Sequence, residues 1–300
     1  MVTRLVAGCG YVGMRVAQRW LNSGDMVYAF TRSTIRQKEL SEIGIRSIVW
    51  NWLENTIPTH DSTWLELCSA LANHPSTLLL AVSHAQVPGI PAAVSHVRGL
   101  CHLKKMLGFA ENLKWIYLST TGVYGNGDQG DWVDEDSRVG PTRAGSIGAY
   151  EAEKWLANSI PSSRRLVLRP AGIYGPNRLP KWESVRDEQV LSMDADSYVN
   201  LIHVDDLVQI IERVSNQNME RTLYCVSDCQ PVLRRDYYEC LSLLGHWPKP
   251  VFVRPSSGAR GEGNKRVQSR CIRTELDYTY LFPTYVEGLK SLFSNSNSTS

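Results

Sequence analysis

The chain has 300 residues, enough for one large domain or two modest ones with a sizeable core. Its 32 basic and 30 acidic residues leave a net charge of +2 without a basic run, which gives no reason to expect nucleic acid or an anionic membrane as a partner. There is no signal-peptide pattern, and no apolar stretch approaches the roughly 20 residues that span a bilayer, so we expect a soluble cytoplasmic protein.

The seven cysteines suit a reducing compartment and give no sign of a metal centre. Their number is odd and their positions are scattered, unlike a disulfide framework. Cys225 and Cys229 are closely spaced but lack a second such pair, so free thiols are expected and no metal site is predicted.

The first half of the chain alternates β-rich runs with helical patterns, which is typical of parallel βαβ units. The expected strands are Arg4–Gly8, Met26–Phe30, Ser47–Trp50, Thr77–Val82, Leu113–Leu118 and Arg165–Leu168. One helix follows the first strand and stops at Ser23-Gly24. A second covers Val94–Phe109, with Val94, Val97, Leu100, Cys101 and Leu107 along one apolar stripe. The pattern predicts an α/β fold with a doubly wound parallel sheet.

The alternation of strands and helices loosens after Pro170. We predict a larger α/β domain over residues 1–172, a smaller C-terminal α+β portion over residues 173–292, and a disordered polar tail over residues 293–300. The segment Asn200–Val214 is expected to pack back on the larger domain. Near the end, four residues share one helical face that suits either the core or a dimer contact: Tyr285, Leu289, Leu292 and Phe293.

The sequence GCGYVG follows the first expected strand and opens the first expected helix. Gly8 permits the tight turn, Gly10 lets the backbone approach a pyrophosphate, and Gly13 lets the helix pack closely on the strand. The phosphates would lie at the start of the helix, beside Tyr11 and Val12. The context predicts a Rossmann domain that binds a dinucleotide.

The end of the second strand indicates which dinucleotide is bound. An NAD site usually carries an acidic residue here for the ribose 2′-hydroxyl, but this strand ends in Thr31, Arg32 and Ser33. Arg32 offers a cation for a 2′-phosphate, with the two neighbouring hydroxyls to assist it. We therefore predict NADP(H) in preference to NAD(H), with a solvated loop arginine as the alternative.

Four further segments carry chemistry in a fixed order. They are Leu118-Ser119-Thr120-Thr121-Gly122-Val123-Tyr124-Gly125, the pair Tyr150 and Lys154, the run Arg169–Pro176 (RPAGIYGP), and the run Asn200–Leu207 (NLIHVDDL). A tyrosine and a lysine four residues apart are neighbours on any helix, so their spacing alone does not decide their purpose. Taken together, the segments resemble those of the extended short-chain dehydrogenases/reductases, the NAD(P)-dependent sugar epimerase/dehydratase family, from about residue 3 to residue 290.

This resemblance implies a role for each matching residue. Thr120 would hydrogen-bond the reacting substrate oxygen, Tyr150 would act as general acid and base, and Lys154 would hold the nicotinamide ribose. Pro170 and Ile173 would face the nicotinamide. The remaining candidates are Ala81, Val82 and Ser83, which would lie against the cofactor, and Asn51 and Trp52, which would lie on the adenine side.

Two departures from the family pattern restrict the expected activity. Ala7 stands where extended members usually carry the first glycine of the turn, which is typical of atypical members with unassigned substrates. Thr121 and Gly122 replace the acidic pair of the dehydratases, so dehydratase activity is not expected. The resemblance therefore implies an oxidoreductase or epimerase for a small-molecule substrate, a sugar or nucleotide-sugar, acting as a monomer or homodimer. The alternative is a non-catalytic NADP(H)-binding regulatory or sensor protein.

Overall fold

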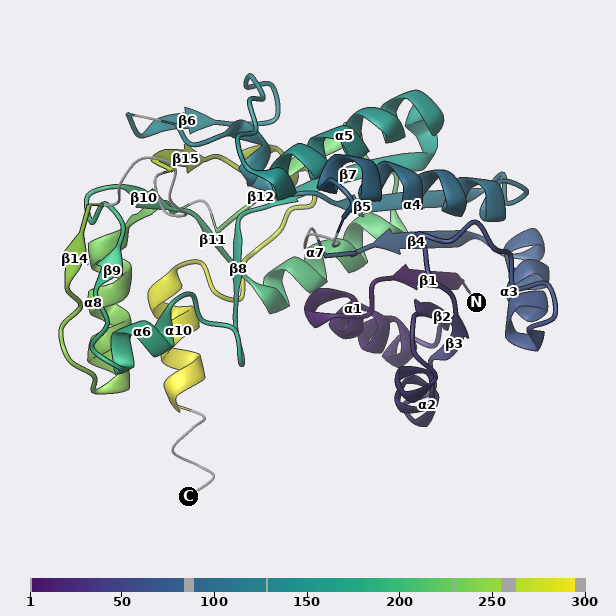
Figure 1. The fold of residues 1–300 in the computed structure, drawn as a ribbon, viewed down its shortest axis with the longest axis horizontal. Helices are drawn as coiled ribbons and strands as arrows, with labels where there is room; N and C mark the ends of the chain where they lie inside the picture. Colours follow the sequence, from purple (N-terminus) through teal and green to yellow (C-terminus); the bar gives the residue numbers. More distant parts are fainter. Residues whose placement is uncertain (1, 84–88, 128, 229, 255–262, 295–300) are drawn as a thin grey trace. The chain divides into compact units, whose positions relative to one another are not determined.

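The computed structural model describes residues 2–83, 89–127, 129–228, 230–254 and 263–294, which Figure 1 traces from the N-terminus to the C-terminus. The chain divides into two compact units, and each is built from separate segments. The first unit comprises residues 1–123, 142–168 and 211–223, and the second comprises residues 124–141, 169–210 and 224–300. The domain boundary expected at residue 172 stays a prediction.

Seven strands form one sheet in the order β12-β7-β5-β4-β1-β2-β3. Their bounds are β1 (Thr3–Ala7), β2 (Met26–Thr31), β3 (Arg46–Val49), β4 (Ser76–Leu80), β5 (Leu113–Leu118), β7 (Arg165–Pro170) and β12 (Leu223–Val226). Neighbouring strands from β3 to β7 all run parallel. The strand order reverses its direction between β1 and β4, which is where ligands bind in such sheets. The predicted doubly wound sheet is confirmed, and β12 is a strand that the sequence analysis did not predict.

Helices of the first unit cover both faces of the sheet. They are α1 (Tyr11–Asn22), α2 (Thr34–Glu42), α3 (Ser62–Asn73), α4 (Ala92–Leu107) and α5 (Ala144–Ser159), with the short 3-10 turns η1 (Thr121–Tyr124) and η2 (Ser162–Arg164). Alternate strand residues such as Leu5, Leu78 and Trp115 share one buried core with residues of α3, α4 and α5. The other face of β1 receives α1, because Arg4 lies over the ring of Trp20. Among the described residues, no helix is long and apolar enough to cross a membrane.

The predicted apolar stripe of α4 is confirmed for Leu100 and Leu107, which are 1% exposed, and wrong for two other residues. Val94 is 45% exposed and Cys101 is also exposed. Besides its apolar residues, the buried face of α4 includes the small or polar residues Ser95, His96 and Gly99. Gly99 is required there, since a Cβ atom would lie 2.1 Å from a ring carbon of Trp52. A hydrophobic pattern does not register a face that is buried through a glycine and polar side chains.

The second unit is a smaller mixture of helices and short strands. Its elements are β6 (Asp131–Val133), β8 (Gly172–Tyr174), α6 (Trp182–Arg186), β9 (Leu191–Ser192), β10 (Tyr198–Val199), β11 (Leu201–His203), β13 (Val232–Leu233), α8 (Arg234–Gly245), β14 (Phe252–Val253), β15 (Lys265–Val267), α9 (Arg270–Glu275) and α10 (Tyr285–Ser294). Helix α7 (Val204–Asn216) begins in the second unit and ends in the first. The short strands pair as β8 with β11, β9 with β14, β6 with β15, and β10 with β13.

The apolar face of the last helix, α10, packs into the core of the second unit. Leu289 of α10 is fully buried with Tyr174 and Leu241, and Tyr285, Leu292 and Phe293 pack against the same cluster. The shared helical face is therefore core. Helix α10 includes Phe293 and Ser294, and the rest of the predicted tail, residues 295–300, lies outside the described residues.

Asp228 of the second unit is a buried carboxyl group that should make stability depend on pH. Burial, with Asp206 nearby, raises the pKa of Asp228 to about 7, although Oδ1 accepts a 3.0 Å hydrogen bond from the Gln230 amide. The folded pKa exceeds the unfolded value, so we expect the free energy of unfolding to fall as the pH rises from about 4 to 7. Asp228→Asn should flatten this decline and stabilise the protein by on the order of 2 kcal/mol at pH 8. Urea unfolding of both proteins between pH 5 and pH 8 is the measurement, and parallel curves would contradict the expectation.

Candidate active site

The three glycines of the first turn differ in what a side chain at each position would meet. Gly8 has φ +101°, and a Cβ atom there would lie 2.5 Å from the carbonyl oxygen of Ala81. A Cβ at Gly13 would lie 2.2 Å from the carbonyl oxygen of Gly8. Gly10, in contrast, has nothing within 4 Å of its Cβ position. The turn therefore packs tightly on β1 and the residue after β4, while leaving open space at Gly10 through which a phosphate group could approach the backbone.

Helix α1 begins directly after this turn, at Tyr11 and Val12. Its N-cap is Gly10, which supplies no side-chain cap, and the Met14 amide donates to the Gly10 carbonyl at 3.0 Å. The first amides of a helix have no intrahelical acceptor, and the helix dipole favours an anion beside them. The first turn of α1 therefore fits the pyrophosphate of a dinucleotide.

Arg36 is a cation beside the glycine turn that the sequence analysis did not identify. Its guanidinium donates to the Cys9 carbonyl at 3.2 Å and pairs with Glu39 at 2.5 Å. The Cys9 thiol is neutral, because burial raises its pKa to about 12 despite the opposing charge of Arg36. The sequence signal was available, since Arg36 lies in the first turn of the helix that follows Arg32.

The last residue of β2 and the two residues after it differ in their exposure and in their hydrogen bonds. Thr31 is buried, while Arg32 and Ser33 are exposed. The Thr31 hydroxyl accepts from the Ser33 amide at 3.4 Å, and the Ser33 hydroxyl accepts from the Arg36 amide at 3.4 Å as the N-cap of α2. Both hydroxyls thus shape the turn into α2, and Arg32 extends from that turn.

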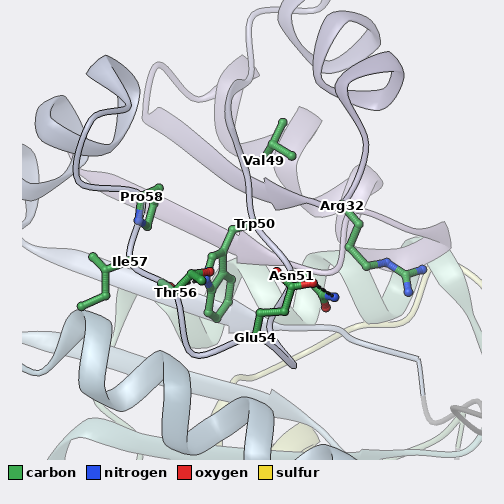
Figure 2. Close-up of a pocket in the computed structure, with 8 residues that line it drawn as sticks. All are labelled: Arg32, Val49, Trp50, Asn51, Glu54, Thr56, Ile57 and Pro58. Carbon is green, nitrogen blue, oxygen red and sulfur yellow. Dashed lines mark hydrogen bonds between the residues drawn. The ribbon is translucent and has the colours of Figure 1, made fainter.

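Arg32 lines a cavity of about 270 Å³ at the ends of β2 and β3. The lining residues are Arg32, Val49, Trp50, Asn51, Glu54, Thr56, Ile57 and Pro58. Figure 2 shows Arg32 and Asn51 at one end of this cavity and Ile57 and Pro58 at the other. The Asn51 amide donates to Glu54 at 2.8 Å, and the Trp50 indole donates to the Thr56 carbonyl at 2.8 Å. The cavity therefore combines a cation, a carboxylate and an aromatic wall, and the sequence analysis identified neither Glu54 nor Trp50 as part of it.

Trp52 lies elsewhere. Its ring packs on Gly99 of α4 and meets His96 edge-on at 5.3 Å between ring centroids. Its carbonyl oxygen is 2.9 Å from Nδ1 of His102. The structure therefore brings Asn51 into the cavity and holds Trp52 against α4.

The remaining cofactor candidates are divided between the two units. In the first unit, the Ala81 amide donates to the Ala7 carbonyl at 2.8 Å, Val82 packs against the core, and Ser83 is exposed. This arrangement continues the line of β4 past the glycine turn. In the second unit, Pro170 ends β7, and Ile173 of β8 pairs with Ile202.

The end of β5 is joined to α5 by a buried hydrogen bond. Ser119 follows β5 and its hydroxyl donates to the carboxylate of Glu153, and these residues are only 4% and 6% exposed. Thr120 comes next, and its hydroxyl oxygen accepts from the Gly122 amide at 3.0 Å. Glu153 lies between Tyr150 and Lys154 on α5. The bond therefore holds this part of α5 against the end of β5, which Thr120 follows. The sequence analysis did not foresee it.

Tyr150 and Lys154 are neighbours on α5. The Lys154 ammonium lies 5.1 Å from the centroid of the Tyr150 ring. It also forms a 2.7 Å ion pair with Glu151, and this hydrogen bond raises the pKa of Lys154. Both partners of the pair are partly exposed, so the pair contributes little to stability and Lys154 can exchange Glu151 for a ligand.

The cysteines and acidic residues offer no metal centre in the part of the chain that the structure describes. Cys9, Cys68, Cys101, Cys225, Cys240 and Cys271 are free thiols, and Cys229 lies outside the described residues. Within the described ranges, no group of three or more His, Cys, Asp or Glu residues could hold a metal ion.

Comparison with known protein sequences finds a family model that matches this chain. The family model described as "NAD dependent epimerase/dehydratase family" matches residues 4–224. No curated protein sequence matches the chain.

Solved structures share the fold at low sequence identity. A putative NAD-dependent epimerase/dehydratase from Methylobacillus flagellatus is 23% identical, with a TM-score of 0.73 and 98% of each chain covered. UDP-glucose 4-epimerase from Thermotoga maritima, solved with UDP-glucose, is 17% identical, with a TM-score of 0.78 and 99% of each chain covered. dTDP-glucose 4,6-dehydratase from Bacillus anthracis, solved with NAD, is 16% identical, with a TM-score of 0.76 and coverage of 100% of this chain and 98% of that one.

Proposed function

The chain belongs to the NAD-dependent epimerase/dehydratase family, and from this premise we propose that it is an oxidoreductase or epimerase acting on a hydroxyl or ketone carbon of a nucleotide-sugar. The observation that carries the proposal is the buried Ser119–Glu153 bond, which sets Thr120 at the end of β5 against the α5 helix of Tyr150 and Lys154. The nucleotide-sugar class is supported by the similar fold of the Thermotoga maritima epimerase that was solved with UDP-glucose.

The residues of this chain divide the work of the reaction. Nicotinamide, when bound, supplies the hydride donor or acceptor. Thr120 would orient the reacting oxygen, and the Tyr150 hydroxyl would give or take a proton at that oxygen. Lys154 would hold the cofactor ribose beside the Tyr150 ring.

We further propose NADP(H) as the preferred cofactor. Arg32 is exposed at the cavity beyond β2, where a 2′-phosphate would meet it, and Arg36 adds a second positive charge beside the glycine turn. Glu54 lines the same cavity and is the residue that would suit the ribose 2′-hydroxyl of NAD(H). Its carboxylate is engaged by the Asn51 amide, which favours the arginine as the group available to the cofactor.

Arg32→Ala should therefore weaken NADPH binding about tenfold and leave NADH binding unchanged, because only NADPH carries the phosphate that loses its cation. The measurement is the dissociation constant of each cofactor by fluorescence titration. Lys38→Ala, an exposed cation on the same helix as Arg36, is the matched control. Tighter binding of NADH than NADPH by the unaltered protein would refute the preference.

Water elimination is not part of the proposal. A dehydratase shares this fold, but Thr121 and Gly122 stand where the family resemblance implies an acidic pair in dehydratases. Gly122 lies so close to Ser146 that a Cβ atom would come within 2.4 Å of its hydroxyl oxygen. An acidic side chain at 122 would displace Ser146.

The experiment that tests the function is turnover of a nucleotide-sugar panel. UDP-glucose is the first probe, with epimerisation at C4 followed by product analysis and oxidation or reduction followed by NADPH absorbance. Turnover of any panel member that requires bound cofactor supports the proposal. Tight cofactor binding without turnover of any member would refute it and favour a non-catalytic NADP(H)-binding sensor.

A further inference from the structure

Ser146 lies beside the proposed catalytic residues without having been assigned a role. It is on α5 four residues before Tyr150, which places both on one helix face. An ideal Cβ atom on Gly122 would lie 2.4 Å from the Ser146 hydroxyl oxygen and 3.3 Å from the Thr120 hydroxyl oxygen. The two hydroxyl oxygens therefore border the same small space beside the Gly122 backbone.

This geometry explains why residue 122 is glycine. A side chain at 122 would occupy the space that the Ser146 hydroxyl takes, whereas the Cβ atom of Ser146 is 3.5 Å away, at ordinary contact distance. The Ser146 hydroxyl oxygen is the closest obstacle, and the Thr120 hydroxyl oxygen at 3.3 Å is also nearer than an ordinary contact. Ser146 and Thr120 are both half-buried.

We propose that Ser146 binds the substrate hydroxyl on the carbon next to the reacting carbon, and so selects substrates in which an oxygen-bearing carbon adjoins the site of hydride transfer. Thr120 would hold the reacting oxygen and Ser146 the neighbouring one, because their hydroxyl oxygens share the space beside Gly122. A serine hydroxyl both donates and accepts, which suits a neutral sugar hydroxyl. This inference rests on the proposed function and adds the substrate class: vicinal diols and the corresponding hydroxyketones.

The geometry is tested first by a double-mutant cycle on stability, which does not depend on activity. Gly122→Ala should lower the melting temperature by several degrees, because its Cβ meets the Ser146 hydroxyl. The double variant Gly122→Ala/Ser146→Ala should recover most of that loss, since the conflicting oxygen is gone. An unrecovered double variant would show that Ser146 does not lie against Gly122 and would overturn the proposal.

The role is tested with UDP-glucose and its 3-deoxy analogue, which lacks the hydroxyl next to C4. Removal of that hydroxyl should lower kcat/KM of the unaltered protein by about 30-fold, and Ser146→Ala should lower kcat/KM for UDP-glucose similarly. In Ser146→Ala the two substrates should differ less than about threefold, because the hydrogen bond is already absent. Cofactor affinity should be unchanged in this variant.

The outcomes separate this inference from the function on which it rests. If the loss of kcat/KM caused by Ser146→Ala and the loss caused by the missing 3-hydroxyl multiply when the variant acts on the deoxy substrate, the role of Ser146 is overturned. The proposed function would still stand. Absence of turnover by the unaltered protein would refute the proposed function, and the same comparison is then made with dissociation constants of the two ligands. Equal loss of affinity for the deoxy ligand in both proteins would again overturn the assignment.

Discussion

Tyr150→Phe is expected to lower kcat by at least about a thousandfold, because the change removes only the hydroxyl that exchanges a proton with the substrate oxygen. The aromatic ring, and with it the contact to the Lys154 ammonium, is retained. We therefore expect the melting temperature to stay within about 2 °C, and the dissociation constant of NADPH within about twofold, of the values for the unaltered protein. Steady-state kinetics with the best nucleotide-sugar of the panel, beside a cofactor titration, are the measurements.

Tyr28→Phe makes the same chemical change at a different place and serves as the control. Tyr28 lies within β2 and its hydroxyl accepts from Arg46 at 3.1 Å, whereas the residues proposed for the cofactor begin at the last residue of that strand. This control should keep its turnover. Retention of more than a tenth of the activity by Tyr150→Phe would show that another group moves the proton.

Gly13→Ala is expected to have the largest effect on stability, about 3 kcal/mol of unfolding free energy, and to abolish cofactor binding. The new Cβ would lie 2.2 Å from the Gly8 carbonyl oxygen and 3.1 Å from a methyl group of Val6. Neither side can yield easily: the first atom is backbone, and Gly8 already lies against Ala81. Helix α1 would have to move away from β1.

The neighbouring substitution Gly10→Ala should change cofactor binding without disturbing the packing of α1. Nothing lies within 4 Å of the Cβ position of Gly10, so its urea unfolding curve should stay close to that of the unaltered protein. Cofactor affinity should still fall, because the methyl group takes the space proposed for the phosphates. If Gly13→Ala were as stable as Gly10→Ala, the close approach of α1 to β1 would be refuted.

Much of the sheet was predictable because its signals are local. Leu113–Leu118 is a run of strand-forming residues, and its predicted bounds coincide with those of β5. The helix expected after the first strand is also observed as α1, and its apolar residues Val16, Ala17 and Trp20 are buried at helical spacing. The glycine motif was also recognisable, since the order of strand, turn and helix is written within one short segment.

Other features depend on residues far apart in the chain. On α4, the ring of Trp52 needs a glycine at position 99, and no periodicity within the helix expresses that need. Trp50 lines the cavity, whereas Trp52 packs on α4. This difference also depends on how the loop after β3 folds back. Neighbouring tryptophans look alike until their partners are in place.

For the candidate site, the amino-acid sequence by itself determined the glycine turn, the order along the chain of the segments that carry the candidate residues, and the Tyr150–Lys154 pair. Only the tertiary structure joined Ser119 to Glu153 across 34 positions and set the Ser146 hydroxyl against Gly122. The physical reason is that periodicity and turn chemistry act between residues close in sequence. A buried hydrogen bond or a missing side chain has meaning only beside the atom that folding brings to it.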